Sequence, residues 1–159
     1  MTKLSNPVDS FKATMPQIIP PIVAWLGYGG LLPFVLLATV TWFDSNHSSL
    51  WRDALLGYGA VILSFVGALH WGFAMSQSDM TTHQRTRSFV WSVVPSLLAW
   101  MALLMTPKYA AMLLLAGFLM HFWQDRRLVQ LVNLPAWYLP LRLRLTLVAC
   151  VSLLSGYIF

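Results

Sequence analysis

The sequence of 159 residues contains no glutamate and a single cysteine, and only 9% of its residues are charged. Ordinary soluble domains have about 25% charged residues, so a single water-soluble domain is excluded. The lone Cys150 cannot form an intrachain disulfide or a cysteine-based metal cluster. No serine, cysteine or carboxylate pair stands in a recognisable hydrolase arrangement, so enzyme activity has no support here and no catalytic residue is predicted.

Acidic residues are also missing from the depth of the long apolar stretches. A proton-driven pump needs a buried carboxylate relay, so this absence counts against one. It leaves open a facilitator for a small solute that uses proline-kinked helices.

Apolar residues make up 58% of the chain and fall into long blocks separated by short polar stretches. Blocks of this length are typical of membrane-spanning helices. We therefore predict an all-α, polytopic integral membrane protein, folded as a compact bundle of five transmembrane helices. The expected spans are residues 22–43, 54–76, 88–105, 109–123 and 143–159, and residues 1–21 form a cytoplasmic N-terminal segment.

Two local features modify these spans. Pro33 lacks the N–H that would bond the Gly29 carbonyl, so a kink is expected near Gly29 and Gly30. Residues 125–144 hold four arginines, and within them the stretch LPAWYLPLRLRL that begins at Leu134 mixes prolines, aromatics and arginines, so we expect this stretch to lie at the membrane interface.

Lysine and arginine are distributed unevenly about the five spans. The N-terminal segment and the loops after spans two and four hold 2 + 2 + 4 = 8 of them, whereas the other side holds only Arg52 and Lys108. The positive-inside rule places the N-terminus in the cytoplasm and the C-terminus in the periplasm or outside the cell. Because the basic residues punctuate apolar spans, no nucleic-acid partner is predicted.

Polar side chains converge only in the cytoplasmic leaflet. Spans two and four run in the same direction, so His70 and His121 lie at similar depth. The other candidate ligand-binding residues at this level are Trp71, Trp91, Ser92, Asp125 and Arg126, and Tyr28 on the first span approaches it.

Three interpretations of this cluster stay open. His70 and His121 are candidate axial ligands for haem b, which would make a redox protein, although no cofactor is expected overall. Aromatic walls, a histidine and an arginine also suit a quinone or lipid headgroup. In the structural interpretation, His70 bonds a backbone carbonyl freed at a proline kink and His121 pairs with Asp125. Asp125 would otherwise be a surface carboxylate neutralised by a neighbouring arginine.

The second span has two faces. Small residues spaced for close helix packing form one face: Gly57, Ala60, Ser64 and Ala68. The opposite face is where a ligand is expected: Gly59, Leu63, Val66 and His70.

Several segments resemble a known family: Trp25–Phe34, Tyr58–Gly72, Ser92–Leu97, and Leu134–Leu139 with Leu141–Leu143. They look like an uncharacterised bacterial inner-membrane family that is itself similar to the animal mitochondrial transmembrane protein 69. The run Ser-Phe-x-Gly-x-x-His-Trp-Gly ending at Gly72 is the most specific part. The resemblance implies a five-span inner-membrane protein without an established activity, and the lack of an evident mitochondrial presequence favours a bacterium.

The leading expectation is a small, non-enzymatic accessory or assembly protein of the bacterial inner membrane. Its expected partners are membrane lipids, with a quinone or another integral membrane protein as further candidates.

Overall fold

The computed structural model describes residues 18–78 and 80–158, and every regular element within them is a helix. This confirms the all-α prediction for the described part of the chain. Residues 1–17, most of the expected cytoplasmic segment, lie outside it. The elements in order are α2 (Pro21–Gly29), α3 (Leu32–Phe43), the 3-10 helix η1 (Ser45–His47), α4 (Ser48–Ser76), α5 (Thr82–Leu103), α6 (Pro107–Leu131) and α7 (Tyr138–Ile158).

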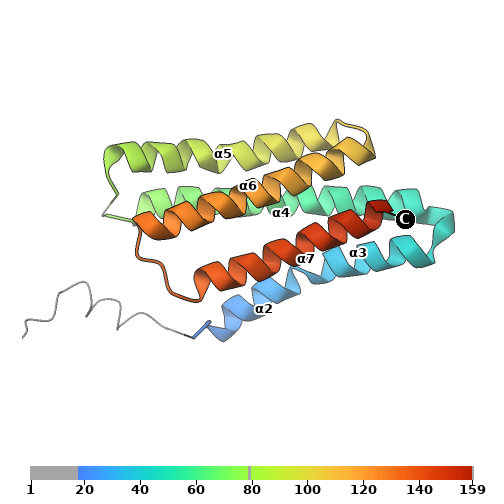
Figure 1. The fold of residues 1–159 in the computed structure, drawn as a ribbon, viewed down its shortest axis with the longest axis horizontal. Helices are drawn as coiled ribbons and strands as arrows, with labels where there is room; N and C mark the ends of the chain where they lie inside the picture. The colour runs from blue at the N-terminus through green and yellow to red at the C-terminus, as the bar shows by residue number, and fades with distance from the viewer. Residues whose placement is uncertain (1–17, 79, 159) are drawn as a thin grey trace, which may run out of the picture.

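The long helices lie side by side in an up-and-down bundle (Figure 1). One end holds the start of α2 and the connectors α4–α5 and α6–α7, whereas the other end holds η1, the α5–α6 turn and the end of α7. The helix α4 packs against α3, α5, α6 and α7 and is therefore the centre of the bundle. Its Leu55 and Leu63 are fully buried, together with Leu114 of α6 and Leu153 of α7.

Three helical stretches are long and apolar enough to cross a membrane, judged by length and composition: Pro21–Phe43, Ser45–Ser76 and Tyr138–Tyr157. The helices α5 and α6 carry more charge, since arginines lie in the first turns of α5 and an aspartate and two arginines near the end of α6. The structure thus supports membrane-spanning helices.

The first expected span is interrupted where Pro33 predicts a kink, and this prediction is confirmed. The helix α2 ends at Gly29 and α3 begins at Leu32, with the proline in the first turn of α3. The first N–H groups of a helix have no partner within it, so proline costs no hydrogen bond there. The hydroxyl of Tyr58 donates to the Gly30 carbonyl at 2.8 Å and ties the break to α4.

The helix α5 begins six residues before the predicted third span because of a capping box. The Thr81 side chain accepts from the Gln84 N–H, and the Gln84 side chain accepts from the Thr81 N–H. These two bonds satisfy orphan donors of the first turn and fix where the helix starts. Residues 82–87, which lie before the predicted third span, are therefore helical.

The helix α6 continues eight residues beyond the predicted end of the fourth span at Trp123. Gln124, Asp125 and Leu128 are buried along this extension. Asp125 finds partners inside the bundle, so the helix has no reason to stop before it. The expected interfacial stretch from Leu134 is helical from Tyr138 onward, where α7 begins, and its place at the membrane interface stays a prediction.

The close-packing face of α4 is the one on which a ligand was expected. A Cβ on Gly67 would lie 2.8 Å from the Pro95 Cβ of α5, and a Cβ on Gly59 would lie 3.3 Å from Leu153 Cδ2 of α7. Only glycine lets the neighbouring helices approach this closely. The expected ligand face is thus occupied by the rest of the protein.

The predicted packing stripe is wrong at both of its ends. A Cβ on Gly57 would meet nothing within 4 Å, and Ala68 is exposed. Ala60 is buried, and the half-buried Ser64 donates to its carbonyl at 2.9 Å within the same helix. Because both faces of α4 carry small residues, spacing alone did not distinguish the packed face.

Candidate functional site

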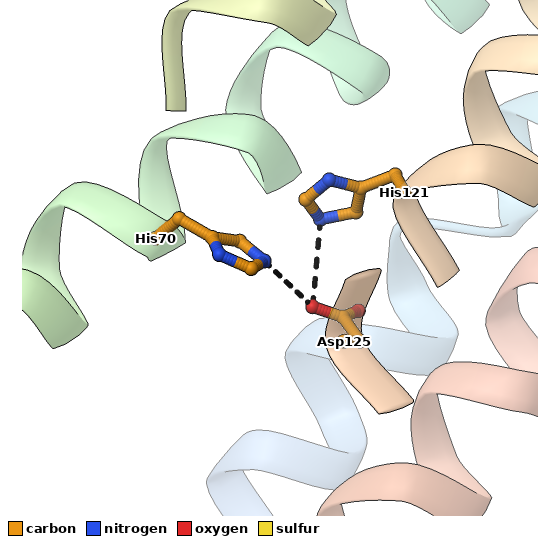
Figure 2. Close-up of side chains that lie close together, drawn as sticks. All are labelled: His70, His121 and Asp125. Atoms are coloured by element: carbon orange, nitrogen blue, oxygen red, sulfur yellow. Dashed lines mark hydrogen bonds and ion pairs between the residues drawn. The ribbon is translucent and has the colours of Figure 1, made fainter. Parts of the chain in front are cut away.

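Asp125 is fully buried, and the rings of His70 and His121 both point toward it (Figure 2). Asp125 lies six residues before the end of α6, and His70 lies six residues before the end of α4. Since these helices run in parallel, the two side chains share one depth, as the sequence predicts for the histidines. Asp125 lies beyond the predicted end of the fourth span at Trp123, so the expectation that no carboxylate lies deep in a membrane span stays a prediction.

Four side chains approach the Asp125 carboxylate. The Nε2 atom of His70 lies 3.0 Å from Oδ1, the Tyr138 hydroxyl donates to Oδ1 at 3.3 Å, and Arg142 Nε donates to Oδ2 at 2.8 Å. His121 Nε2 lies 3.7 Å from Oδ1, which is too long for a hydrogen bond. An isolated buried charge is costly, so these partners explain how the carboxylate can lie inside the bundle.

This geometry corrects two predictions about the cluster. The partner of His70 is a carboxylate from another helix instead of a backbone carbonyl. Asp125 is not a surface carboxylate paired with the arginine that follows it, because Arg142 of α7 supplies the cation. His121 does face Asp125 one turn on, as the structural interpretation expects.

The hydrogen bonds assign the tautomers of both histidines. Trp91 Nε1 donates to His121 Nδ1 at 3.3 Å, so Nδ1 carries a lone pair and the neutral ring has its proton on Nε2. His70 donates from Nε2 to Asp125, which leaves a lone pair on Nδ1, a buried atom with no hydrogen-bond partner in the described part of the chain. Neutral rings in these tautomers would leave Asp125 and Arg142 to balance each other, and the cluster would have no net charge.

Three ligand atoms for a metal ion are present, since His70, His121 and Asp125 offer buried atoms within 4.8 Å of one another. The bond from Trp91 argues against metal binding, because it places a proton on the His121 nitrogen that faces the carboxylate. Arg142 adds a positive charge to the same carboxylate. These residues do not fit a divalent metal ion.

A haem between the histidines does not fit either. The ring centroids of His70 and His121 lie 5.0 Å apart in an edge-to-face contact, and both Nε2 atoms face Asp125. A haem iron held by two histidines needs the macrocycle between the rings. The described arrangement has no space for it.

Trp91 and Ser92 lie beside this cluster, in contrast to the remaining candidates. Ser92 is buried and donates to the Phe89 carbonyl of its own helix at 2.6 Å. Its backbone carbonyl would lie 3.1 Å from a Cβ on Gly67, so it belongs to the α4–α5 contact.

Three further predicted site residues lie away from the cluster. Trp71 is half exposed and donates to Met75 Sδ at 3.1 Å, and Arg126 is exposed. Adjacent residues of a helix point in different directions, so neither follows its buried neighbour into the bundle. Tyr28 is exposed, and its hydroxyl accepts from Arg144 Nη1 at 3.2 Å.

Sequence reasoning missed Tyr138 and Arg142, the two contributions of α7. The pattern Leu-Arg-Leu-Arg contains a signal, because arginines two positions apart on a helix cannot share a face. Arg142 is 7% exposed, whereas Arg144 is exposed. A buried aspartate also requires a buried cation, but the sequence alone does not show that Asp125 is buried.

A cavity of about 320 Å³ borders the cluster, lined by residues of α2, α3, α4, α6 and α7 and by Trp137 of the α6–α7 connector. Its walls are mainly apolar, and they include Tyr138 and Arg142, two of the side chains that bond Asp125. Trp137 carries a buried Nε1–H for which the described residues offer no acceptor. The aromatic rings that line the cavity belong to Phe34, Phe65, Phe118, Trp137 and Tyr138.

Comparison with known proteins identifies the family. Residues 19–158 match the family described as "Protein of unknown function (DUF3429)". The chain is 37% identical over 144 residues to Transmembrane protein 69 of Xenopus tropicalis, covering 87% of this chain and 54% of that protein. It is 25% identical over 137 residues to Transmembrane protein 69 of Mus musculus, covering 84% and 54%.

The chain spans about half the length of these curated relatives, and no solved structure matches it. The match over nearly all of the described residues, together with the relatives' name, confirms the resemblance and the membrane-protein prediction. The chain belongs to the DUF3429 family of proteins of unknown function.

Proposed function

We propose that this protein crosses the bacterial inner membrane five times, with its N-terminus in the cytoplasm. The helices α5 and α6 have 22 and 25 residues. At the standard rise they are about 33 and 37 Å long, enough for a hydrocarbon core of about 30 Å. Their outer faces are apolar, as lipid contact requires, with exposed Val90, Leu97, Trp100, Met112 and Leu119.

We propose that the bundle is a non-enzymatic binding protein that holds a lipid-like molecule in the cavity beside the Asp125 cluster. The observation that carries this proposal is the lining: an apolar wall that reaches a polar end at Tyr138, Arg142 and Trp137. A volume of about 320 Å³ lies at the lower end of the range for small-molecule sites. Tyr138 and Arg142 are its titratable lining residues, and neither suits acid–base chemistry near neutral pH.

Filling the cavity tests this proposal. Leu69→Trp adds an indole to the cavity wall, and Val61→Trp adds the same group on the exposed face of the same helix. Native mass spectrometry of protein extracted in mild detergent should show a bound lipid-like mass on the wild type and on Val61→Trp, and none on Leu69→Trp. Equal occupancy of all three proteins, or an empty wild type, would overturn the proposal. A partner helix in the same place would appear as a second polypeptide.

The topology has a separate test. Alkaline phosphatase fused after Phe159 should be active, because the proposed orientation puts that fusion in the periplasm. An inactive phosphatase with a fluorescent GFP fusion at the same position would contradict the five-span orientation.

A further inference from the structure

We infer that the ligand is a quinone with an apolar tail, bound through an uncharged carbonyl at the Trp137 and Arg142 end of the cavity. This inference rests on the proposed function and names the chemistry of the molecule in the same site.

The polar end of the cavity offers hydrogen-bond donors. Trp137 Nε1–H is buried without a partner among the described residues, and the guanidinium of Arg142 uses Nε for Asp125. No acceptor in the described part of the chain bonds its two terminal nitrogens. The Tyr138 hydroxyl donates to Asp125. A buried donor without a partner is costly, so a molecule that fits here presents an acceptor.

The charge of the cluster selects an uncharged acceptor. Arg142 is balanced by Asp125, and we take His70 and His121 to be neutral rings in the tautomers that fit their hydrogen bonds. A phosphate or carboxylate would bring an unbalanced negative charge into a site of low dielectric constant. The next arginine along α7, Arg144, is exposed and bonds Tyr28. A carbonyl oxygen accepts the same hydrogen bonds without adding a charge.

The size and walls of the cavity favour a single flat ring over a pair of acyl chains. Five aromatic rings line a volume of about 320 Å³. Aromatic side chains pack well on the face or the edge of another ring. A quinone head with the beginning of its tail matches this space, whereas a two-chain lipid needs a larger groove.

Calorimetric titration in nanodiscs tests the inference, with empty nanodiscs to correct for partitioning. The probes are decylubiquinone, dioctanoyl phosphatidic acid and dioctanoylglycerol, which present an uncharged quinone, a phosphate and an ester carbonyl. Decylubiquinone should bind at least tenfold more tightly than either lipid. Tighter or equal binding of phosphatidic acid would overturn the choice of an uncharged head, and equal binding of dioctanoylglycerol would overturn the choice of a quinone.

Matched tryptophan variants locate the head group. Trp137→Phe keeps the ring and removes the N–H, so the affinity for decylubiquinone should fall about 3- to 10-fold. Trp100→Phe removes the same group from the exposed face of α5 and should leave the affinity unchanged. Equal affinities of the two variants would contradict the inference. If a co-purified lipid is still lost from Leu69→Trp while quinone fails to bind, the proposed function stands and only the quinone is wrong.

Discussion

At the end of the bundle where α4 and α6 finish, Asp125 is fully buried and accepts hydrogen bonds from α4 and α7. At the opposite end Asp44 lies between α3 and η1 with a third of its side chain exposed, and it accepts from Trp51 Nε1 at 3.1 Å and contacts His47 Nδ1 at 3.0 Å. Both carboxylates thus have a histidine as partner. Burial separates them, because only Asp125 needs a cation to remain charged.

The two cavities differ in the same way. A cavity of about 460 Å³ lies between α3 and α7 toward the Asp44 end and has no charged side chain in its lining. Its Trp42 donates to the Ser155 carbonyl at 3.1 Å, whereas Trp137 of the smaller cavity has a buried N–H without an acceptor in the described residues. The unpaired Trp137 donor is therefore the feature that distinguishes the cavity proposed as the site from the larger one.

Removing the buried carboxylate should have the largest effect. Asp125→Ala leaves Arg142 buried without a counter-charge, and we expect the free energy of unfolding to fall by about 3–5 kcal/mol. Chemical unfolding in detergent measures this loss. Asp44→Ala should lower the unfolding midpoint far less than Asp125→Ala, because solvent replaces the partners of an exposed carboxylate.

A second substitution shows how much of this loss comes from leaving the Arg142 charge buried and unpaired. Arg142→Leu added to Asp125→Ala removes the unpaired charge and should recover most of the stability. Equal stabilities of the single and double variants would show that the ion pair is not what Asp125 contributes.

The next largest effect concerns the two faces of α4. Gly67→Ala places a methyl group 2.8 Å from the Pro95 Cβ, and overpacking of this kind costs about 1–3 kcal/mol. Gly57→Ala is the matched control, since its methyl group meets nothing within 4 Å. Thermal unfolding should show a lower midpoint for the first variant alone, and the opposite order would contradict the assignment of the packed face.

The tryptophan pair should respond in opposite directions when no ligand is bound. Trp42→Phe loses the hydrogen bond to the Ser155 carbonyl. Because Trp42 is half exposed, the free energy of unfolding should fall by only about 0.5 kcal/mol. Trp137→Phe removes a donor that has no partner in the part of the chain that the structure describes, and it should leave the delipidated protein equally or more stable. A loss of stability in Trp137→Phe alone would mean that its N–H is bonded within the protein.

The smallest effect is the pH dependence from Asp44. The hydrogen bond from Trp51 foremost, with the contacts to His47, lowers the pKa of Asp44 below its ordinary value of 3.8. A carboxyl group whose pKa is lower in the folded state than in the unfolded state stabilises the fold. This contribution is fully present at a pH above the unfolded-state pKa, and it is lost as the pH falls through the folded-state pKa. The difference in melting temperature between the wild type and Asp44→Asn should therefore shrink below pH 3.8. A difference that grows on acidification would contradict this sign.

Local sequence signals predicted much of the fold. The kink follows from Pro33, and the shared depth of His70 and His121 follows from the direction of two spans. The burial of Asp125 was missed because a charge next to two arginines reads as a helix end. Its position depends on Arg142 of another helix, and a sequence pattern does not show which side chains of distant helices meet.

The neutral cluster underlies both the exclusion of a metal ion and haem and the choice of an uncharged ligand. Solid-state NMR of ¹⁵N-histidine-labelled protein in bilayers reports the protonation of each ring nitrogen directly, with His70→Gln and His121→Gln variants for assignment. We predict that at neutral pH both His70 and His121 are neutral and carry the proton on Nε2. A doubly protonated ring, or a proton on His121 Nδ1, would contradict the account.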